Sequence, residues 1–259
     1  MVGHAALGPR LTLVRQADRI PYGDDPCQYA ELSRPAGESR GVVVVIHGGF
    51  WKTAYDASLG RPLAASLADE GWTAWNLEYR RVGNGGGMPA TLDDVAAGID
   101  ALADVDGLDT TRVITLGHSA GGHLATWAAS RGRFKRWQPE RVRVTGVVSQ
   151  AGVLDLRTAH VLALGDGAVD GFLSHPPGPD DDPVDPLRQV PLDVPVRCVH
   201  GRDDTTVPPS QSADYVAAAT AAGADADLLE VDGDHFVVID TSTDVWARTL
   251  DLLEALPSR

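Results

Sequence analysis

The chain has 259 residues, and its 36 aspartates and glutamates outnumber its 22 lysines and arginines, giving a formal net charge of -14 at pH 7. This negative charge argues against nucleic acids and anionic membranes as partners, since both are negatively charged themselves. The length suits a single compact domain over residues 1–259, and two cysteines are too few for a disulfide framework.

The N-terminal residues 1–25 contain arginines and prolines but no continuous apolar stretch. They fit neither a signal peptide nor a membrane-spanning helix, because both need a longer apolar run. We therefore expect a cytoplasmic protein.

Strand-like and helix-like segments then alternate, which is typical of an α/β fold with a mostly parallel sheet and helices on both faces. An edge strand is expected at 29–32, and core strands at 42–46, 72–77, 112–116, 144–149, 196–200 and 226–231. Helices are expected at 57–68, 91–103 and 122–129. The strand at 42–46 is almost purely β-branched, as in strands buried on both faces, and it leads into His47-Gly48-Gly49-Phe50-Trp51.

Residues Gly117-His118-Ser119-Ala120-Gly121 spell G-x-S-x-G directly after the strand expected at 112–116. A strand-to-helix turn this tight requires glycine on both sides of the serine, since a side chain there would clash with neighbouring backbone. The small residues and helix formers that follow suit a helix packed closely beneath the serine. Ser119 is therefore the predicted nucleophile, the alternative being an ordinary turn serine.

A serine hydroxyl is a weak nucleophile, so this prediction requires a base and a group that orients the base. Hydrolases with this elbow run serine, acid and histidine in that order along the chain. The strand at 196–200 leads into a loop with Asp203 and Asp204, and the strand at 226–231 precedes a turn with His235. His235 is the predicted general base, whereas residue type alone leaves the two aspartates equal as the acid.

Three motifs together resemble those of α/β-hydrolases of the esterase and kynurenine-formamidase-like branch: H-G-G-F-W at 47–51, G-H-S-A-G-G-H-L at 117–124, and H-G-R-D-D-T-T-V-P at 200–208. The resemblance covers nearly the whole chain and implies the α/β-hydrolase fold. In that family the acid is the aspartate of H-G-x-x-D, which falls on Asp204.

The resemblance also implies an oxyanion hole. In esterases the glycines of H-G-G-x let backbone N–H groups point at the developing oxyanion, together with the N–H of the residue after the nucleophile. Those donors correspond to Gly49, Phe50 and Ala120, with Gly48 as a less favoured candidate. His47 is expected to hydrogen-bond this loop and fix its shape.

Other aromatic side chains near these motifs have more than one interpretation. Trp51 either offers an aromatic wall to a flat substrate or packs in the core, and it is grouped with His47 as a candidate for the substrate pocket. His118 and His123 flank the nucleophile but are interpreted as packing residues. No sequence pattern assigns a role to His200.

The segment 155–192 is the least regular part of the chain. Insertions after the sixth core strand commonly form a cap in this fold, so a short lid that shapes substrate choice is predicted here. Its acidic run at 180–182 is interpreted as a solvated loop in preference to a cation site. We expect no metal and no organic cofactor, because no four-ligand Cys/His spacing appears and the glycines at 85–87 lack nucleotide-binding spacing.

The predicted function is that of a serine hydrolase that cleaves small carboxylic esters or aryl formamides through an acyl-enzyme. A small peptidase is an alternative, because H-G-x-x-D-x-x-V-P also occurs in prolyl-oligopeptidase-like enzymes. A ligand-binding homologue without catalysis is another, although the intact Ser119, Asp204 and His235 argue against it. The expected partner is a small-molecule ester or amide, and the sequence does not indicate an oligomeric state.

Overall fold

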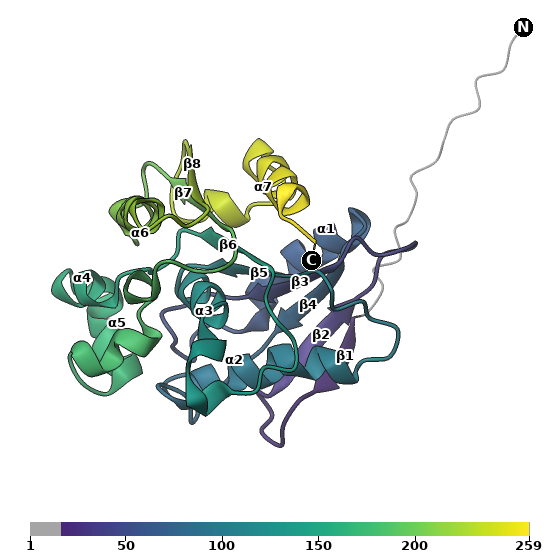
Figure 1. Ribbon diagram of the computed structural model, residues 1–259, viewed down its shortest axis with the longest axis horizontal. Coiled ribbons are helices and arrows are strands. Elements are labelled where there is room, and N and C mark those ends of the chain that lie inside the picture. Colours follow the sequence, from purple (N-terminus) through teal and green to yellow (C-terminus); the bar gives the residue numbers. More distant parts are fainter. Residues whose placement is uncertain (1–16, 259) are drawn as a thin grey trace, which may run out of the picture.

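The computed structural model describes residues 17–258, which form an eight-stranded sheet flanked by helices (Figure 1). The strands are β1 (Asp18–Pro21), β2 (Tyr29–Ser33), β3 (Val42–Ile46), β4 (Thr73–Leu77), β5 (Val113–His118), β6 (Gly146–Gln150), β7 (Val196–Gly201) and β8 (Ala226–Val231). Their spatial order is β1-β2-β4-β3-β5-β6-β7-β8, with antiparallel pairing at β1–β2 and β2–β4 and parallel pairing elsewhere. The prediction of a mostly parallel α/β-hydrolase sheet is confirmed.

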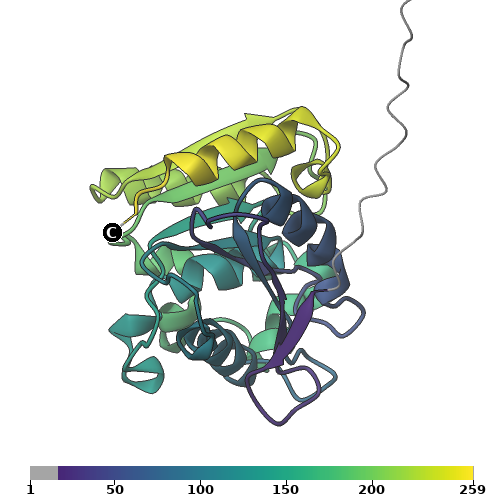
Figure 2. The same cartoon turned by 90° about the vertical axis from the view of Figure 1, so that its right-hand side faces the viewer.

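Helices cover both faces of this sheet (Figure 2). The α-helices are α1 (Arg61–Asp69), α2 (Ala90–Asp100), α3 (Ala120–Ala128), α4 (Leu156–Val161), α5 (Leu164–Leu173), α6 (Ser210–Ala221) and α7 (Asp244–Ala255). Short 3-10 helices are η1 (Ala57–Gly60), η2 (Ala101–Asp104), η3 (Arg131–Arg133), η4 (Lys135–Trp137), η5 (Pro179–Val184), η6 (Pro186–Gln189) and η7 (Val237–Ile239). Side chains of α1 and α7 share one core cluster, and those of α2, α3 and α6 share the other.

The valine-rich strand β3 contributes to both cores, as its composition predicts. Val42, Val44 and Ile46 belong to the cluster with α2 and α3, whereas Val43 and Val45 belong to the cluster with α1 and α7. Alternate side chains of a strand point to opposite faces, so a strand covered on both sides needs apolar residues throughout. This burial, worth about 1.5–3 kcal/mol per large side chain, fixes the end of β3 beneath the site.

The predicted strands all occur, with ends that differ by at most two residues from those observed. The helix predicted over 57–68 is divided into η1 and α1. Strand β1 has no counterpart in the sequence prediction, because three of its four residues are exposed and no apolar alternation marks it. An edge strand of this kind depends on pairing with its neighbour more than on its own pattern.

The prediction about residues 1–25 falls largely on residues 1–16, outside the part that the structure describes. Within residues 17–258, no helix combines the length and apolar character needed to cross a membrane. The cytoplasmic location stays a prediction.

The segment 155–192 is mostly helical, comprising α4, α5, η5 and η6, so it is more regular than the sequence indicates. It reaches the loop after β3, where the Lys52 ammonium group donates to the Gly165 carbonyl at 2.6 Å. The interpretation of its acidic run as solvated is wrong for Asp181, which is 4% exposed and accepts the Gly178 N–H at 2.7 Å. Within residues 17–258, no group of three or more His, Cys, Asp or Glu side chains is arranged to hold a metal ion.

Candidate active site

Ser119 lies at the sharp turn between β5 and α3. Its φ of 57° and ψ of -120° are unusual for a residue with a side chain and store strain of about 1–3 kcal/mol. The backbone around it is fixed, since its N–H donates to the Gln150 carbonyl at 2.8 Å and its carbonyl accepts from Gly122 at 2.9 Å. The side chain is therefore presented by a rigid turn, although only 2% of the residue is exposed.

Glycines allow this turn to pack against the backbone of β3. A Cβ atom on Gly117 would lie 2.0 Å from the Gly121 carbonyl oxygen, and one on Gly121 would lie 2.0 Å from that of Ile46. On the loop after β3, a Cβ on Gly48 would lie 3.0 Å from the Cβ of Ser119. The two glycine motifs are thus in direct contact, which explains their glycine content.

His235 and Asp204 lie in the loops that follow β8 and β7, two neighbouring parallel strands. The Nδ1 of His235 is 2.6 Å from Oδ2 of Asp204, and the two residues are 4% and 5% exposed. The neighbouring Asp203 is exposed to solvent. The structure thus brings Asp204, and not Asp203, to the histidine. A carboxylate on Nδ1 favours the tautomer with a proton there, which leaves Nε2 free to accept a proton.

Asp204 accepts hydrogen bonds on both of its oxygens. Its Oδ1 accepts the N–H groups of Thr206 and Val207 at 2.8 and 2.9 Å, and Nε2 of His200 lies 3.2 Å from its Oδ2. Burial alone would raise the pKa of this carboxyl, but the hydrogen bonds from His200, His235 and Val207 outweigh it and hold the pKa well below its ordinary value. Asp204 is therefore ionised at neutral pH.

His200 is a part of the site that sequence reasoning missed. It is fully buried, and its Nδ1 lies 2.7 Å from the Ser212 hydroxyl while its Nε2 lies 2.9 Å from the Val207 carbonyl. It orients the loop that carries Asp204. The available signal was its position as the first residue of H-G-x-x-D, four residues before that aspartate.

His118 and His123 are buried histidines on either side of Ser119 along the chain. Nε2 of His118 lies 2.9 Å from the carbonyl oxygen of His235, and burial, with the charge of His235, lowers the pKa of His118 to about 3. Nε2 of His123 donates to the Val184 carbonyl at 2.8 Å, and burial lowers the pKa of His123 to about 4. Both histidines are therefore neutral in the folded protein near pH 7.

These lowered pKa values predict a pH-dependent stability. Between about pH 6.5 and pH 4 the unfolded chain binds protons on His118 and His123 that the folded chain does not. The free energy of unfolding should be highest above pH 6.5. As the pH decreases through this window, it should decrease by about 1.4 kcal/mol per pH unit for each histidine. Urea unfolding at several pH values measures this slope, and His123→Gln should remove one histidine's share. An unchanged slope in the variant would contradict the assignment.

The loop after β3 carries the candidate oxyanion donors, and residues 47–57 are called the oxyanion loop below. Gly49, Phe50 and Trp51 all have positive φ values, of 110°, 52° and 55°, and the Lys52 N–H closes the turn on the Gly49 carbonyl at 3.0 Å. None of the hydrogen bonds within residues 17–258 uses the N–H groups of Gly49, Phe50 or Ala120. Ala120 is also the first residue of α3, where the helix dipole favours negative charge.

The side chains of His47 and Trp51 are buried, with 2% and 1% of each residue exposed. The Trp51 ring stacks on Phe172 with centroids 4.7 Å apart, and its Nε1 lies 3.3 Å from Nδ1 of His123. Trp51 thus joins the oxyanion loop to α3 and α5 within the core. Nδ1 of His47 donates to the Gly48 carbonyl at 2.8 Å, within the loop itself.

Two other aromatic rings beside the site are exposed to solvent. Phe236 is 54% exposed and lies 5.3 Å from the His235 ring, measured between centroids. Tyr55 is 47% exposed, and its ring covers Gly49, where a Cβ would lie 2.6 Å from the tyrosine side chain. Sequence reasoning missed both residues, because neither belongs to a motif.

Two cavities of about 450 Å³ each lie away from this site. Both are lined by Val194 and Pro195, which precede β7, and the first is also lined by Val144 and Thr145, which precede β6. Ser119 follows a parallel strand of the same sheet, so these cavities lie at the opposite edge. They are separate from the chemistry that the site supports.

Comparison with known proteins places this geometry in a family. The BD-FAE family model matches residues 31–218. The chain is 32% identical to Esterase LipC of Mycobacterium tuberculosis over 128 residues, which are 47% of this chain and 32% of LipC. It is 26% identical to isoprenylcysteine alpha-carbonyl methylesterase ICME of Arabidopsis thaliana over 236 residues, which are 83% of this chain and 55% of that protein. The chain thus spans only part of these relatives.

Solved structures show the same fold. An acetyl ester-xyloside bifunctional hydrolase from Caldicellulosiruptor lactoaceticus superposes with a TM-score of 0.75 at 22% identity, covering 94% of this chain and 96% of that one. The resemblance to α/β-hydrolase esterases is confirmed, whereas the kynurenine-formamidase-like branch stays a prediction. With a family match over most of its length, the chain is an α/β-hydrolase that belongs to the BD-FAE family.

Proposed function

We propose that this chain is a carboxylic ester hydrolase with Ser119 as nucleophile, His235 as general base and Asp204 as the acid that orients the base. The observation that carries the proposal is the 2.6 Å contact between buried His235 and Asp204, in loops beside an intact nucleophile elbow. The names of the relatives, which are esterases, support the same reaction class.

The proposed reaction forms and then hydrolyses an acyl-enzyme. Oγ of Ser119 attacks the carbonyl carbon of the ester while Nε2 of His235 takes the hydroxyl proton, and Asp204 stabilises the resulting imidazolium. The tetrahedral oxyanion accepts hydrogen bonds from the N–H groups of Gly49, Phe50 and Ala120. The imidazolium then gives its proton to the departing alkoxide, and a water activated by the same histidine releases the acid.

Aryl formamides are a second candidate substrate class. The exposed rings of Tyr55 and Phe236 favour this option, because flat aromatic groups stack on such surfaces. Trp51, which the sequence offered as an aromatic wall, is too deeply buried for this contact. The reaction with a formamide uses the same residues and releases formate from the acyl-enzyme.

A substrate panel tests the proposal. The wild type should hydrolyse p-nitrophenyl acetate and butyrate faster than the octanoate, with N-formylkynurenine and a prolyl peptide p-nitroanilide measured beside them. Faster cleavage of N-formylkynurenine than of any ester would move the function to an arylformamidase, and faster cleavage of the anilide to a peptidase. No hydrolysis of any member would contradict an enzyme and favour a ligand-binding homologue.

A further inference from the structure

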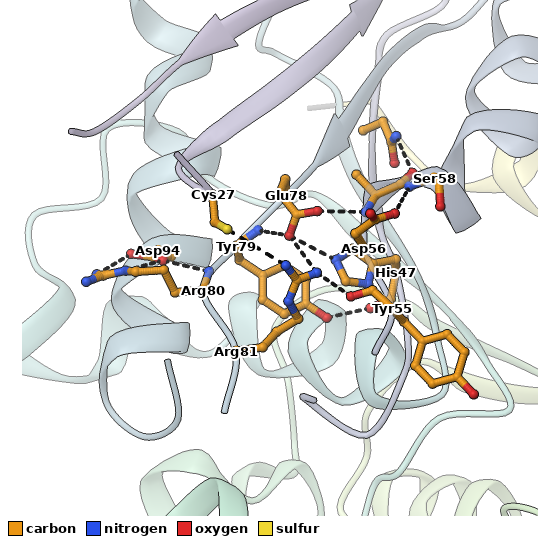
Figure 3. Close-up of polar contacts among 12 residues, drawn as sticks. Cys27, His47, Tyr55, Asp56, Ser58, Glu78, Tyr79, Arg80, Arg81 and Asp94 are labelled. Carbon is orange, nitrogen blue, oxygen red and sulfur yellow. Dashed lines mark hydrogen bonds and ion pairs between the residues drawn. The ribbon is translucent and has the colours of Figure 1, made fainter. Parts of the chain in front are cut away.

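The oxyanion loop rests on residues 78–82, which follow β4 and are called the β4 tail. The Tyr79 hydroxyl donates to the His47 carbonyl at 2.7 Å (Figure 3). The Val82 N–H donates to the Trp51 carbonyl at 2.8 Å. The Tyr79 ring also stacks on the His47 ring, with centroids 4.4 Å apart. The β4 tail therefore binds the loop on both sides of the candidate oxyanion donors.

Glu78 is the charged centre of this contact, and it is 2% exposed. Its Oε2 accepts the Ala57 N–H at 2.8 Å, and its Oε1 accepts the Tyr79 N–H at 2.9 Å and lies 2.9 Å from Nη1 of Arg81 (Figure 3). Nε2 of His47 lies 3.4 Å from the same Oε1. One carboxylate thus contacts both the first and the last residue of the oxyanion loop.

The ionised state of Glu78 is favoured by these partners. Burial alone would raise the pKa of the carboxyl, but the hydrogen bond and charge of His47, the Ala57 N–H and the charge of Arg81 outweigh it and lower the pKa. If either the carboxylate or its partners were removed, the group that remained would be buried with its charge or hydrogen-bonding capacity unpaired, which costs stability. The contact around Glu78 therefore holds the β4 tail and the oxyanion loop together.

Arg81 extends the contact to the surface above the donors. Its Nη1 also donates to the Tyr55 carbonyl, and the ring of Tyr55 covers Gly49. The guanidinium is 5% exposed. Glu78, Arg81 and Tyr55 consequently form a continuous path of contacts from the β4 tail to a candidate donor.

The oxyanion loop requires such support, because its backbone is strained. Phe50 and Trp51 are successive non-glycine residues with φ values of 52° and 55°. Residues with side chains rarely adopt this region, and they remain there only when the surrounding structure holds them. The contacts of the β4 tail reach residues before, within and after this strained pair.

We propose that Glu78 is a positioning residue that holds the oxyanion loop in the geometry needed to bind the transition state, an inference that rests on the proposed ester hydrolysis. Glu78 touches no reacting atom and acts through His47, Ala57 and Arg81. A displaced N–H donor weakens binding of the oxyanion more than binding of the uncharged ester, so the effect falls on kcat more than on KM.

Glutamine cannot replace this carboxylate, although it has nearly the same shape. The hydrogen bonds that the Glu78 oxygens accept come from the Ala57 N–H on one oxygen and from the Tyr79 N–H on the other, where Nη1 of Arg81 also lies at 2.9 Å. An amide group on either side would set N–H against N–H. The substitution should therefore release one end of the oxyanion loop.

The test compares Glu78→Gln with Asp100→Asn in the full chain. Asp100 also pairs with a buried arginine, since its Oδ1 accepts from Nη2 of the fully buried Arg131 at 2.9 Å and from the Val142 N–H at 3.1 Å. Its partners lie in neither the oxyanion loop nor the β4 tail. With p-nitrophenyl butyrate, Glu78→Gln should lower kcat by about 10- to 100-fold, less than the 10²–10³-fold loss typical of a deleted donor. KM should stay within about twofold, and Asp100→Asn should keep kcat within about twofold of the wild type.

Tyr79→Phe is a milder second variant, because it removes only the hydroxyl bond to the His47 carbonyl and keeps the stacked ring. It should lower kcat by about three- to tenfold, and it decides the question if Glu78→Gln does not fold. The rate of phosphonylation by p-nitrophenyl ethylphosphonate, which also develops charge in the oxyanion hole, should fall in parallel with kcat. Urea unfolding of each variant separates this effect from lost stability.

The outcomes distinguish the two proposals. An active wild type with unchanged kcat in folded Glu78→Gln and Tyr79→Phe would overturn the positioning role and leave ester hydrolysis standing. Equal losses of kcat in Glu78→Gln and Asp100→Asn would also overturn it, since the loss would then not depend on contact with the oxyanion loop. A wild type that hydrolyses no ester would overturn the proposed function and the inference with it.

Discussion

Ser119→Ala is expected to lower kcat for p-nitrophenyl butyrate by about 10⁶-fold, as when the nucleophile of other serine hydrolases is removed. Alanine cannot form the acyl-enzyme, so only binding and the oxyanion donors remain. The methyl group fits the same turn, and the fold should be retained because the backbone bonds of Ser119 to Gln150 and Gly122 do not involve its hydroxyl. Initial rates at saturating ester, with protein confirmed as folded by circular dichroism, measure the loss.

Ser149→Ala is the matched control for this variant. Ser149 is a fully buried serine at the adjacent strand β6, and its hydroxyl faces Gly122 and Gly152 instead of the site. Its removal should leave kcat within about threefold of the wild type, because deleting a buried hydroxyl that does not contact the site changes stability more than activity. A loss in Ser149→Ala as large as that in Ser119→Ala would contradict the assignment of the nucleophile.

Asp204→Asn should lower kcat by about 10⁴-fold near pH 7. An asparagine amide that faces Nδ1 of His235 favours the tautomer with the proton on Nε2, and that nitrogen can then no longer accept the serine proton. The neighbouring Asp203→Asn is the matched control, because Asp203 is exposed and should tolerate the change with less than a twofold effect. A larger loss in Asp203→Asn than in Asp204→Asn would reverse the choice of acid.

The low pKa of Asp204 also fixes the direction of its effect on stability. Because the folded value lies below the unfolded value, the carboxylate stabilises the fold above about pH 4, the unfolded pKa, and this contribution is lost as the pH falls through the folded value. Asp204→Asn therefore removes stability at neutral pH as well as activity. Unfolding measurements must accompany its kinetics.

Most of the correct sequence predictions of the fold and the candidate site came from short, continuous patterns. The run at 42–46 and the G-x-S-x-G after β5 are continuous segments, and their chemistry needs particular residues at fixed spacing. The approach of Gly121 to the backbone of β3 follows from that spacing, since only glycine fits there. The order of serine, acid and histidine similarly selected Asp204 and His235, which the structure then brings into contact.

Contacts between distant segments could not be predicted in the same way. Glu78 lies 31 residues after His47, and no periodic signal or motif links the β4 tail to the oxyanion loop. The burial of Trp51 against Phe172 likewise depends on how the segment 155–192 folds back onto the core. Such pairings are set by tertiary packing, which composition and spacing do not encode.

The central claim, that Ser119 is the nucleophile, is tested most directly by covalent labelling. The protein would be incubated with p-nitrophenyl ethylphosphonate, digested, and its peptides examined by mass spectrometry. We expect one phosphonyl group per chain, on Ser119, with release of one p-nitrophenol and no labelling of Ser119→Ala. Labelling at another residue, or equal labelling of Ser119→Ala, would contradict the account.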